Sequence, residues 1–286
     1  MTLVLATLVL LTAACGSDGS NPTASVDATD ATEADSSEPA DEEAGPKEAG
    51  DEEAGDEEAG DVKLETETGQ VPELGSGVVT GSVEVNGSEI EYALLTPEGF
   101  EIGDSAPVLV ALPPGGQNLG LAQSVLDDTY RTEALARGWV VVSPAAPDGT
   151  LYFQGSEVLI PSLLDWVETW VTPEGGAVHL AGISNGGRSA FRVAVQNPDR
   201  VASLVVFPGF PDDQDLAGLE AIAGIPIHMF VGGNDTGWIA PTQVALDALT
   251  ELGADASFEI LEGEGHVMAS LSDGKIVFDL LDAARR

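Results

Sequence analysis

The sequence has few basic residues, few histidines and a single cysteine. Ten Lys and Arg residues stand against 49 Asp and Glu residues, which gives a net charge of −39 at pH 7. Because such a chain repels phosphate groups, we expect no nucleic-acid partner and no direct binding to an anionic membrane. One cysteine, Cys15, cannot form an intramolecular disulfide, so the stability of the fold has to come from its core.

The three histidines are scattered along the chain at positions 179, 228 and 266. Neither they nor the cysteine show the spacing typical of a metal site, and no glycine-rich phosphate loop with its lysine is present. We therefore expect neither a metal nor a cofactor, so that any chemistry rests on side chains.

Long hydrophobic runs are also missing, apart from residues 1–14. A run of about 14 residues is shorter than the roughly 20 that a membrane-spanning helix needs, which favours a removable export signal. The small residues before Cys15 resemble the lipobox of bacterial lipoproteins. This resemblance implies that Cys15 is acylated and anchors the protein to the outer face of the membrane in the cell envelope; otherwise the protein is secreted. The alternative for Cys15 is a buried free cysteine.

Residues 15–74 are dominated by acidic and small side chains, with the pentapeptides DEEAG, PKEAG, DEEAG and DEEAG over positions 41–60. Like charges and low hydrophobicity cannot offset the entropy of folding, so this segment is predicted to be a disordered acidic tether. The folded domain is expected over residues 75–286.

Within that domain, short apolar runs alternate with amphipathic stretches. Strands are predicted at 78–85, 89–95, 108–112, 139–143, 178–183, 201–207, 227–231 and 257–261, and helices at 121–137, 159–171, 186–196, 242–252 and 276–284. The first two strands flank Asn86-Gly87, which is typical of a hairpin. The alternation that follows predicts an α/β fold with a mostly parallel, doubly wound sheet after an N-terminal antiparallel hairpin.

Ser184 lies in Gly182-Ile183-Ser184-Asn185-Gly186, which matches G-x-S-x-G between a predicted strand and a predicted helix. In that context the glycines permit a sharp turn that presents the hydroxyl above the sheet, as a nucleophile requires. The alternative is a glycine-rich turn in which the serine only caps the helix.

A serine hydroxyl needs an adjacent base to take its proton. His179 and His228 fall inside predicted strands, whereas His266 follows the last strand in a glycine-rich loop, so His266 is the predicted base. The chain order Ser, acid, His is typical of serine enzymes built on such a sheet, and Asp235 directly follows a strand between the other two. Weaker candidates for the acid are Asp212, Asp213 and Asp215, and a plain solvated turn remains the alternative for Asp235.

Acyl transfer also needs donors for the oxyanion. One is expected to be the backbone N–H of Asn185, at the start of the helix. The second is expected from the loop after residues 108–112, where Pro113 and Pro114 have no N–H and Gly115 or Gly116 remain, with Gln117 as a further option. The alternative for this loop is an ordinary turn.

From about residue 76 to the end, the SNGG that begins at Ser184 makes the chain resemble the secreted esterase and polyhydroxybutyrate depolymerase-like branch of the α/β-hydrolases. The resemblance implies a triad of Ser184, Asp235 and His266 and an oxyanion loop over residues 113–117. Relatives usually begin that loop with His-Gly, whereas this sequence has Pro113-Pro114.

Trp238, Tyr152 and Phe153 are the aromatic residues expected near the pocket, with core packing as the alternative. The predicted function is cleavage of a small-molecule or polymeric carboxylic ester through an acyl-enzyme. The alternatives are an acyltransferase or serine peptidase with the same triad, and a surface lipoprotein that binds a ligand without catalysis.

Overall fold

The computed structural model describes residues 71–285. The predicted signal at 1–14, Cys15 and the tether as far as residue 70 lie outside the described residues. Residues 71–74, the end of the predicted tether, contain no helix or strand, and the first strand begins at Val79.

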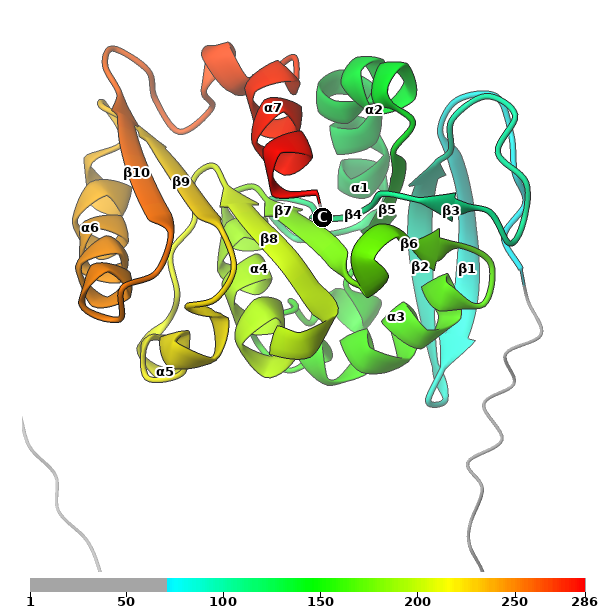
Figure 1. The fold of residues 1–286 in the computed structure, drawn as a ribbon, viewed down its shortest axis with the longest axis horizontal. Coiled ribbons are helices and arrows are strands. Elements are labelled where there is room, and N and C mark those ends of the chain that lie inside the picture. The colour runs from blue at the N-terminus through cyan, green and yellow to red at the C-terminus, as the bar shows by residue number, and fades with distance from the viewer. Residues whose placement is uncertain (1–70, 286) are drawn as a thin grey trace, which may run out of the picture. The chain divides into compact units, whose positions relative to one another are not determined.

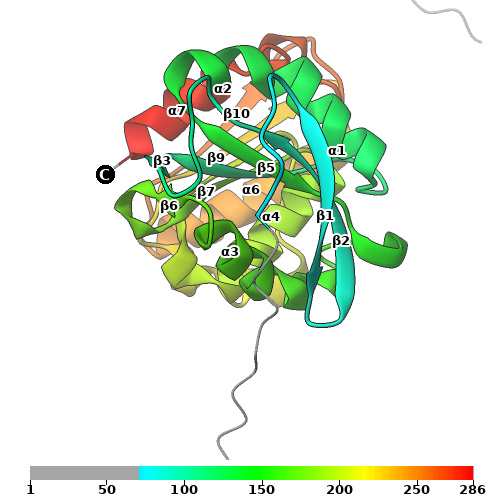
Figure 2. The ribbon, with the colours of Figure 1, turned by 90° about the vertical axis from the view of Figure 1, so that its right-hand side faces the viewer.

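An eight-stranded sheet runs through the domain in the order β1-β2-β5-β4-β7-β8-β9-β10 (Figure 1). The strands are β1 (Val79–Val85), β2 (Ser88–Leu95), β4 (Val108–Leu112), β5 (Val140–Pro144), β7 (Val178–Gly182), β8 (Val201–Val206), β9 (Ile227–Gly232) and β10 (Ala256–Leu261). Strand β2 pairs antiparallel with both β1 and β5, and every other pairing is parallel. Figure 2 shows the β1–β2 hairpin at the near edge of the sheet. The predicted mostly parallel sheet with an N-terminal hairpin is confirmed.

Helices cover both faces of this sheet (Figure 1). They are α1 (Leu119–Val125), α2 (Arg131–Arg137), α3 (Ile160–Glu168), α4 (Asn185–Gln196), α5 (Asp213–Leu216), α6 (Thr236–Glu251) and α7 (Lys275–Ala284). A two-residue pairing of β3 (Ser105–Ala106) with β6 (Thr172–Pro173), which the sequence did not predict, adds a small second sheet.

The central strands are buried on both faces, and alternate side chains enter two separate cores. In β4, Val108 and Val110 join the core under α3, α4 and α6, whereas Leu109 and Ala111 join the core under α1, α2 and α7. Such strands need apolar residues at every position, which explains the continuous apolar runs in the sequence. The two cores together hold the carboxyl ends of the parallel strands at one edge of the sheet. The loops that follow β4, β7, β9 and β10 emerge there.

Two predicted helices differ from those observed. The helix predicted at 121–137 is divided by a π-helical segment, Leu126–Tyr130, between α1 and α2. The helix predicted at 242–252 begins earlier, at Thr236, and Pro241 lies inside it, in the second turn. Because proline has no N–H, one intrahelical hydrogen bond is absent at Pro241, yet the helix continues to Glu251.

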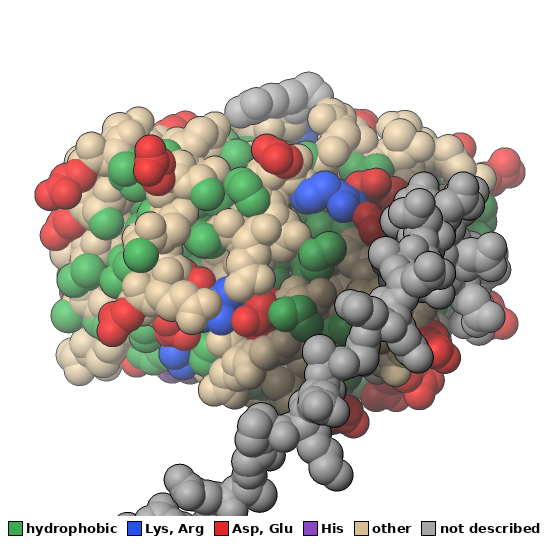
Figure 3. All heavy atoms as spheres, turned by 90° about the horizontal axis from the view of Figure 1, so that it is seen from below, with side chains coloured by type: hydrophobic (Ala, Val, Ile, Leu, Met, Phe, Trp, Pro, Cys, Tyr) green, Lys and Arg blue, Asp and Glu red, His purple; other side chains and the backbone are tan. Residues whose placement is uncertain are grey.

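Acidic side chains are spread over the face seen from below, with few basic side chains among them (Figure 3). Several basic side chains are held in ion pairs, for example Arg137 with Glu133, Asp279 and Asp282. Among residues 71–285, no helix has the length and apolar character to cross a membrane.

One buried histidine lies in the sheet. His179 in β7 is 2% exposed, its Nδ1 is 2.7 Å from Oγ of Ser203, and its ring packs edge-on against Trp139. Burial lowers the pKa of His179 to about 4, with a further lowering from the charge of Arg285. The imidazole is therefore neutral in the folded protein under conditions in which the unfolded chain would bind a proton.

The stability of the domain should fall as the pH decreases from 6.5 toward 4, in part through His179. The folded-state pKa lies below the ordinary value of 6.5, so the unfolded state binds the extra proton and this residue removes up to about 3 kcal/mol across that window. Urea unfolding of wild type and His179→Asn at pH 7 and pH 4.5 measures the difference, and the variant should lose less stability. Equal losses in the two proteins would contradict this assignment.

Candidate active site

Ser184 occupies a sharp turn between β7 and α4. Its backbone has φ 58° and ψ −119°, a strained conformation for a residue with a Cβ. Its N–H donates to the carbonyl of Pro208 at 2.8 Å, and a Cβ on Gly182 would lie only 2.2 Å from the carbonyl oxygen of Gly186. The Ser184 side chain forms no capping bond with α4, which excludes the capping-serine interpretation and leaves Oγ free to react.

His266 reaches this hydroxyl from the loop after β10, with Nε2 at 2.9 Å from Oγ of Ser184. The loop is fastened to the end of β9. The N–H of Asn234 donates to the carbonyl of Glu264 at 2.8 Å, and a Cβ on Gly232 would lie 2.1 Å from the carbonyl oxygen of Gly265. Close backbone contact therefore fixes the loop that carries the imidazole.

Asp235, which follows β9 and immediately precedes α6, lies on the other side of the imidazole. Its Oδ2 is 2.6 Å from Nδ1 of His266. Because a carboxylate only accepts hydrogen bonds, Nδ1 carries the proton and the lone pair of Nε2 faces Ser184. The side chain of Asp235 is 16% exposed, whereas that of His266 is 43% exposed, so the imidazole is open to water.

The other two histidines lie in strands, as predicted, with hydroxyl partners of their own. His179 pairs with Ser203, and Nδ1 of His228 is 2.8 Å from Oγ of Ser257. Only His266 approaches Ser184 among the histidines.

The weaker acid candidates are directed elsewhere. Asp212 forms an ion pair with Arg188, and the buried Asp215 forms one with Arg192. Asp213, at the first position of α5, is exposed. None of the three bonds to His266, whose carboxylate partner is Asp235.

The expected oxyanion donors lie next to one another. Within residues 71–285, the backbone N–H groups of Asn185, Gly115 and Gly116 have no hydrogen-bond acceptor. The side-chain Nδ2 of Asn185 donates to the carbonyl of Gly115 at 2.9 Å, which ties the loop after β4 to the start of α4. The N–H of Gln117 is already bound to the carbonyl of Pro114, so Gln117 is not a free donor.

Gln117 has a structural role that no sequence pattern indicated. Its side chain is fully buried, with Nε2 donating to Oγ of Ser189 on α4 and Oε1 accepting from the N–H of Tyr152. Its carbonyl accepts from the N–H of Ala146 at 2.7 Å. These partners are distant in sequence, and through them Gln117 holds the candidate oxyanion loop in place.

The three aromatic residues expected near the pocket occupy different places. The ring of Trp238 lies 5.2 Å from the imidazole of His266 and 5.0 Å from the ring of Phe210, measured between centroids. Phe153 lines a cavity beside this group. Tyr152 is instead fully buried in the core, with its hydroxyl donating to the carbonyl of Ala145.

Over residues 71–285, no three His, Cys, Asp or Glu side chains gather as metal ligands would. The site is a hydroxyl, an imidazole and a carboxylate joined in series, next to free backbone donors.

Gly186→Ala should destabilise the turn that carries Ser184. The new Cβ would lie 2.0 Å from the carbonyl oxygen of Leu112, so α4 has to move away from β4 at a cost of about 1–3 kcal/mol. Urea unfolding measures the loss. Gly224→Ala is the matched control, since its Cβ would meet no atom within 4 Å, and its stability should stay within about 0.5 kcal/mol of wild type. Equal stability of both variants would contradict the close approach.

No family model and no curated protein matches this sequence. Solved structures do, at low identity. The chain is similar to a thermostable esterase (TM-score 0.60, 17% identity, 73% of this chain and 64% of that one). It is also similar to an S-formylglutathione hydrolase from Agrobacterium tumefaciens (TM-score 0.56, 17% identity, 73% and 93%) and to a ferulic acid esterase (TM-score 0.55, 17% identity, 73% and 97%).

The chain thus spans less than two thirds of the thermostable esterase and nearly the whole of the other two proteins. The shared part is the mostly parallel sheet with its flanking helices. This chain has the α/β-hydrolase fold.

Proposed function

We propose that the protein is a serine hydrolase that cleaves carboxylic esters, with Ser184 as nucleophile, His266 as general base and Asp235 as the acid that orients it. One observation carries the proposal, namely the unbroken series from Oγ of Ser184 through both nitrogens of His266 to Oδ2 of Asp235. Three residues from three different loops rarely meet in this order without a chemical use.

In the first step, Nε2 of His266 takes the proton of Ser184 while Oγ attacks the ester carbonyl. Asp235 holds the imidazole in the required tautomer and stabilises the imidazolium that forms. The N–H of Asn185, with that of Gly115 or Gly116, donates to the oxyanion of the tetrahedral intermediate. The imidazolium then gives its proton to the departing alcohol, which leaves an acyl group on Ser184.

In the second step, water replaces the alcohol. His266 takes a proton from water as the oxygen attacks the acyl carbonyl, and the collapse of the second intermediate returns that proton to Oγ of Ser184. The carboxylic acid leaves and the site is restored. The exposure of the imidazole supports this step, because water reaches it directly.

The same exposure favours hydrolysis over transfer. An acyltransferase or a peptidase can use the same triad, but transfer to another acceptor requires a site that excludes water. With 43% of the His266 side chain exposed, hydrolysis is the better supported outcome.

A lipoprotein that only binds its ligand is the remaining alternative. Such a protein has no need of a free Oγ within 2.9 Å of an imidazole whose other nitrogen meets a carboxylate. We therefore favour an enzyme. Export, an acylated Cys15 and a polymeric ester as substrate, in the manner of polyhydroxybutyrate depolymerases, belong to the same proposal.

Hydrolysis of p-nitrophenyl acetate and butyrate should depend on all three residues. Ser184→Ala should abolish turnover, His266→Ala should remove nearly all of it, and Asp235→Asn should reduce kcat by on the order of 10⁴-fold through loss of the correct tautomer. Initial rates, with circular dichroism to verify folding, measure these effects.

His228→Ala is the matched control, because it removes a histidine with a hydroxyl partner outside the site, and it should keep kcat within about twofold of wild type. A fluorophosphonate should label wild-type protein at Ser184. If wild type hydrolyses no ester and Ser184 is not labelled, the binding-lipoprotein alternative replaces this proposal.

A further inference from the structure

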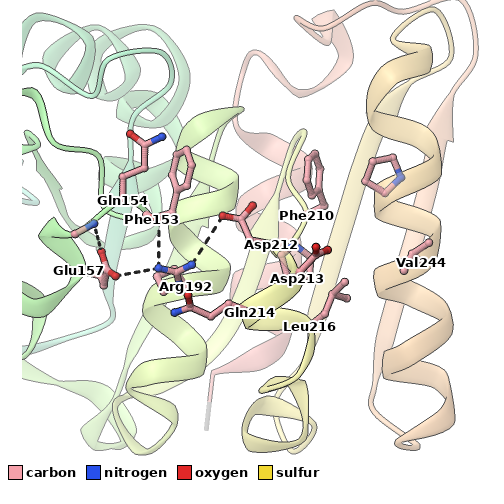
Figure 4. Close-up of a pocket in the computed structure, with 13 residues that line it drawn as sticks. Phe153, Gln154, Glu157, Arg192, Phe210, Asp212, Asp213, Gln214, Leu216 and Val244 are labelled. Atoms are coloured by element: carbon pink, nitrogen blue, oxygen red, sulfur yellow. Dashed lines mark hydrogen bonds and ion pairs between the residues drawn. The ribbon is translucent and has the colours of Figure 1, made fainter. Parts of the chain in front are cut away.

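A cavity of about 840 Å³ lies between the loop around residues 153–157 and the segment 210–216, with α6 at its side (Figure 4). Its volume falls within the range of pockets that enclose small molecules. Leu216, Pro241 and Val244 give it an apolar side, and Phe153 and Phe210 stand at its opposite walls.

The aromatic walls connect this cavity to the catalytic residues. The guanidinium of Arg188 lies over the ring of Phe153 at 4.1 Å and 5.4 Å from that of Phe210, and the N–H of Arg188 donates to the carbonyl of Ser184. On the other side, Phe210 contacts Trp238, which contacts the imidazole of the base. No residue of the triad lines the cavity itself, and the cavity is linked to the base through Phe210 and Trp238.

Arg192 joins the two walls from the helix that carries the nucleophile. It lies two turns along α4 and is almost fully buried. Its Nε is 2.5 Å from Oδ1 of Asp215 in the segment 210–216. Its Nη1 is 2.9 Å from Oε1 of Glu157 and 3.2 Å from the carbonyl of Phe153, on the other side of the cavity (Figure 4).

Arg192 is the cation that meets a buried carboxylate from each of the two segments, Glu157 and Asp215. Glu157 is 7% exposed and Asp215 is 1% exposed, and buried carboxylates are costly without a countercharge. Oδ2 of Asp215 has no hydrogen-bond partner in the described part of the chain, and burial raises the pKa of this carboxyl. Without Arg192, two buried acidic groups on opposite walls would have no cation between them, and the walls would have to move.

We propose that Arg192 is a positioning residue that fixes the width of this cavity, that the cavity takes the larger group of the ester, and that Arg192 thereby determines which esters are accepted. The inference rests on the proposed function. Within residues 71–285, the hydrogen bonds and ion pairs of Arg192 go to Phe153, Glu157, Asp212 and Asp215 and none goes to the triad. Its effect is on the fit of the substrate.

The test uses the full chain and compares its KM values for esters of different size. One series varies the acyl group, from p-nitrophenyl acetate to decanoate, and the other varies the alcohol, from methyl acetate to octyl acetate. The quantity measured is the KM of the largest ester divided by that of the smallest. Arg192→Met should change this ratio by about tenfold or more in one series, because a change in the width of the cavity affects the large ester more than the small one. Uniform damage to catalysis would leave the ratio unaltered.

Arg192→Lys should change the ratio less, since lysine keeps the charge and loses the planar fork. Arg200→Met is the matched control. It removes an arginine with two carboxylate partners, Asp165 and Glu168, just beyond α4 and away from the cavity, and should keep the ratio within about twofold.

An unchanged ratio in both series, or an equal fall in kcat for every ester, overturns the proposal. If Arg192→Met does not fold, Glu157→Gln should change the same ratio, because it weakens the contact of Arg192 with one wall alone. An unchanged ratio in Glu157→Gln would also overturn the proposal. If the wild type hydrolyses no ester and is not labelled by the fluorophosphonate, the proposed function is rejected, and this inference with it.

Discussion

The structure around the candidate site depends on the close backbone approach at Ser184. A residue with a Cβ is held at positive φ there, between the ends of β4 and β8, and that conformation is retained only because its neighbours leave no alternative. Gly182 and Gly186 permit the approach, since a side chain at either position would overlap a carbonyl. The exposed hydroxyl is thus a consequence of packing at the ends of parallel strands.

Helix α4 supports more than its first residue. Ser189, one turn inward, binds the side chain of Gln117 and so fixes the loop that offers the oxyanion donors. Arg192, one turn further, binds the walls of the adjoining cavity. Helix α4 therefore positions the nucleophile, the oxyanion donors and the walls of the cavity. Support from one rigid element keeps the geometry of a site within the limits that catalysis needs.

Much of this could be predicted from local patterns. The strands are buried on both faces and therefore read as short continuous apolar runs, and the glycines around Ser184 marked the turn. His266 was distinguished from the other histidines by its glycine-rich loop after the last strand. The start of α6 was predicted too late, at residue 242 instead of Thr236, and Tyr152 was expected near the pocket although it is buried in the core.

The sequence by itself determined the order of strands and helices, the fold class and the residue types available for chemistry, because these follow from local periodicity and from the scarcity of histidine, cysteine and basic residues. Only the tertiary structure decided that Oγ of Ser184 meets His266, that Asp235 meets the same ring, and that Gln117 and Arg192 brace the surroundings. Those contacts join segments far apart in the chain, and their geometry is set by the twist of the sheet and the packing of α4, which no local pattern records.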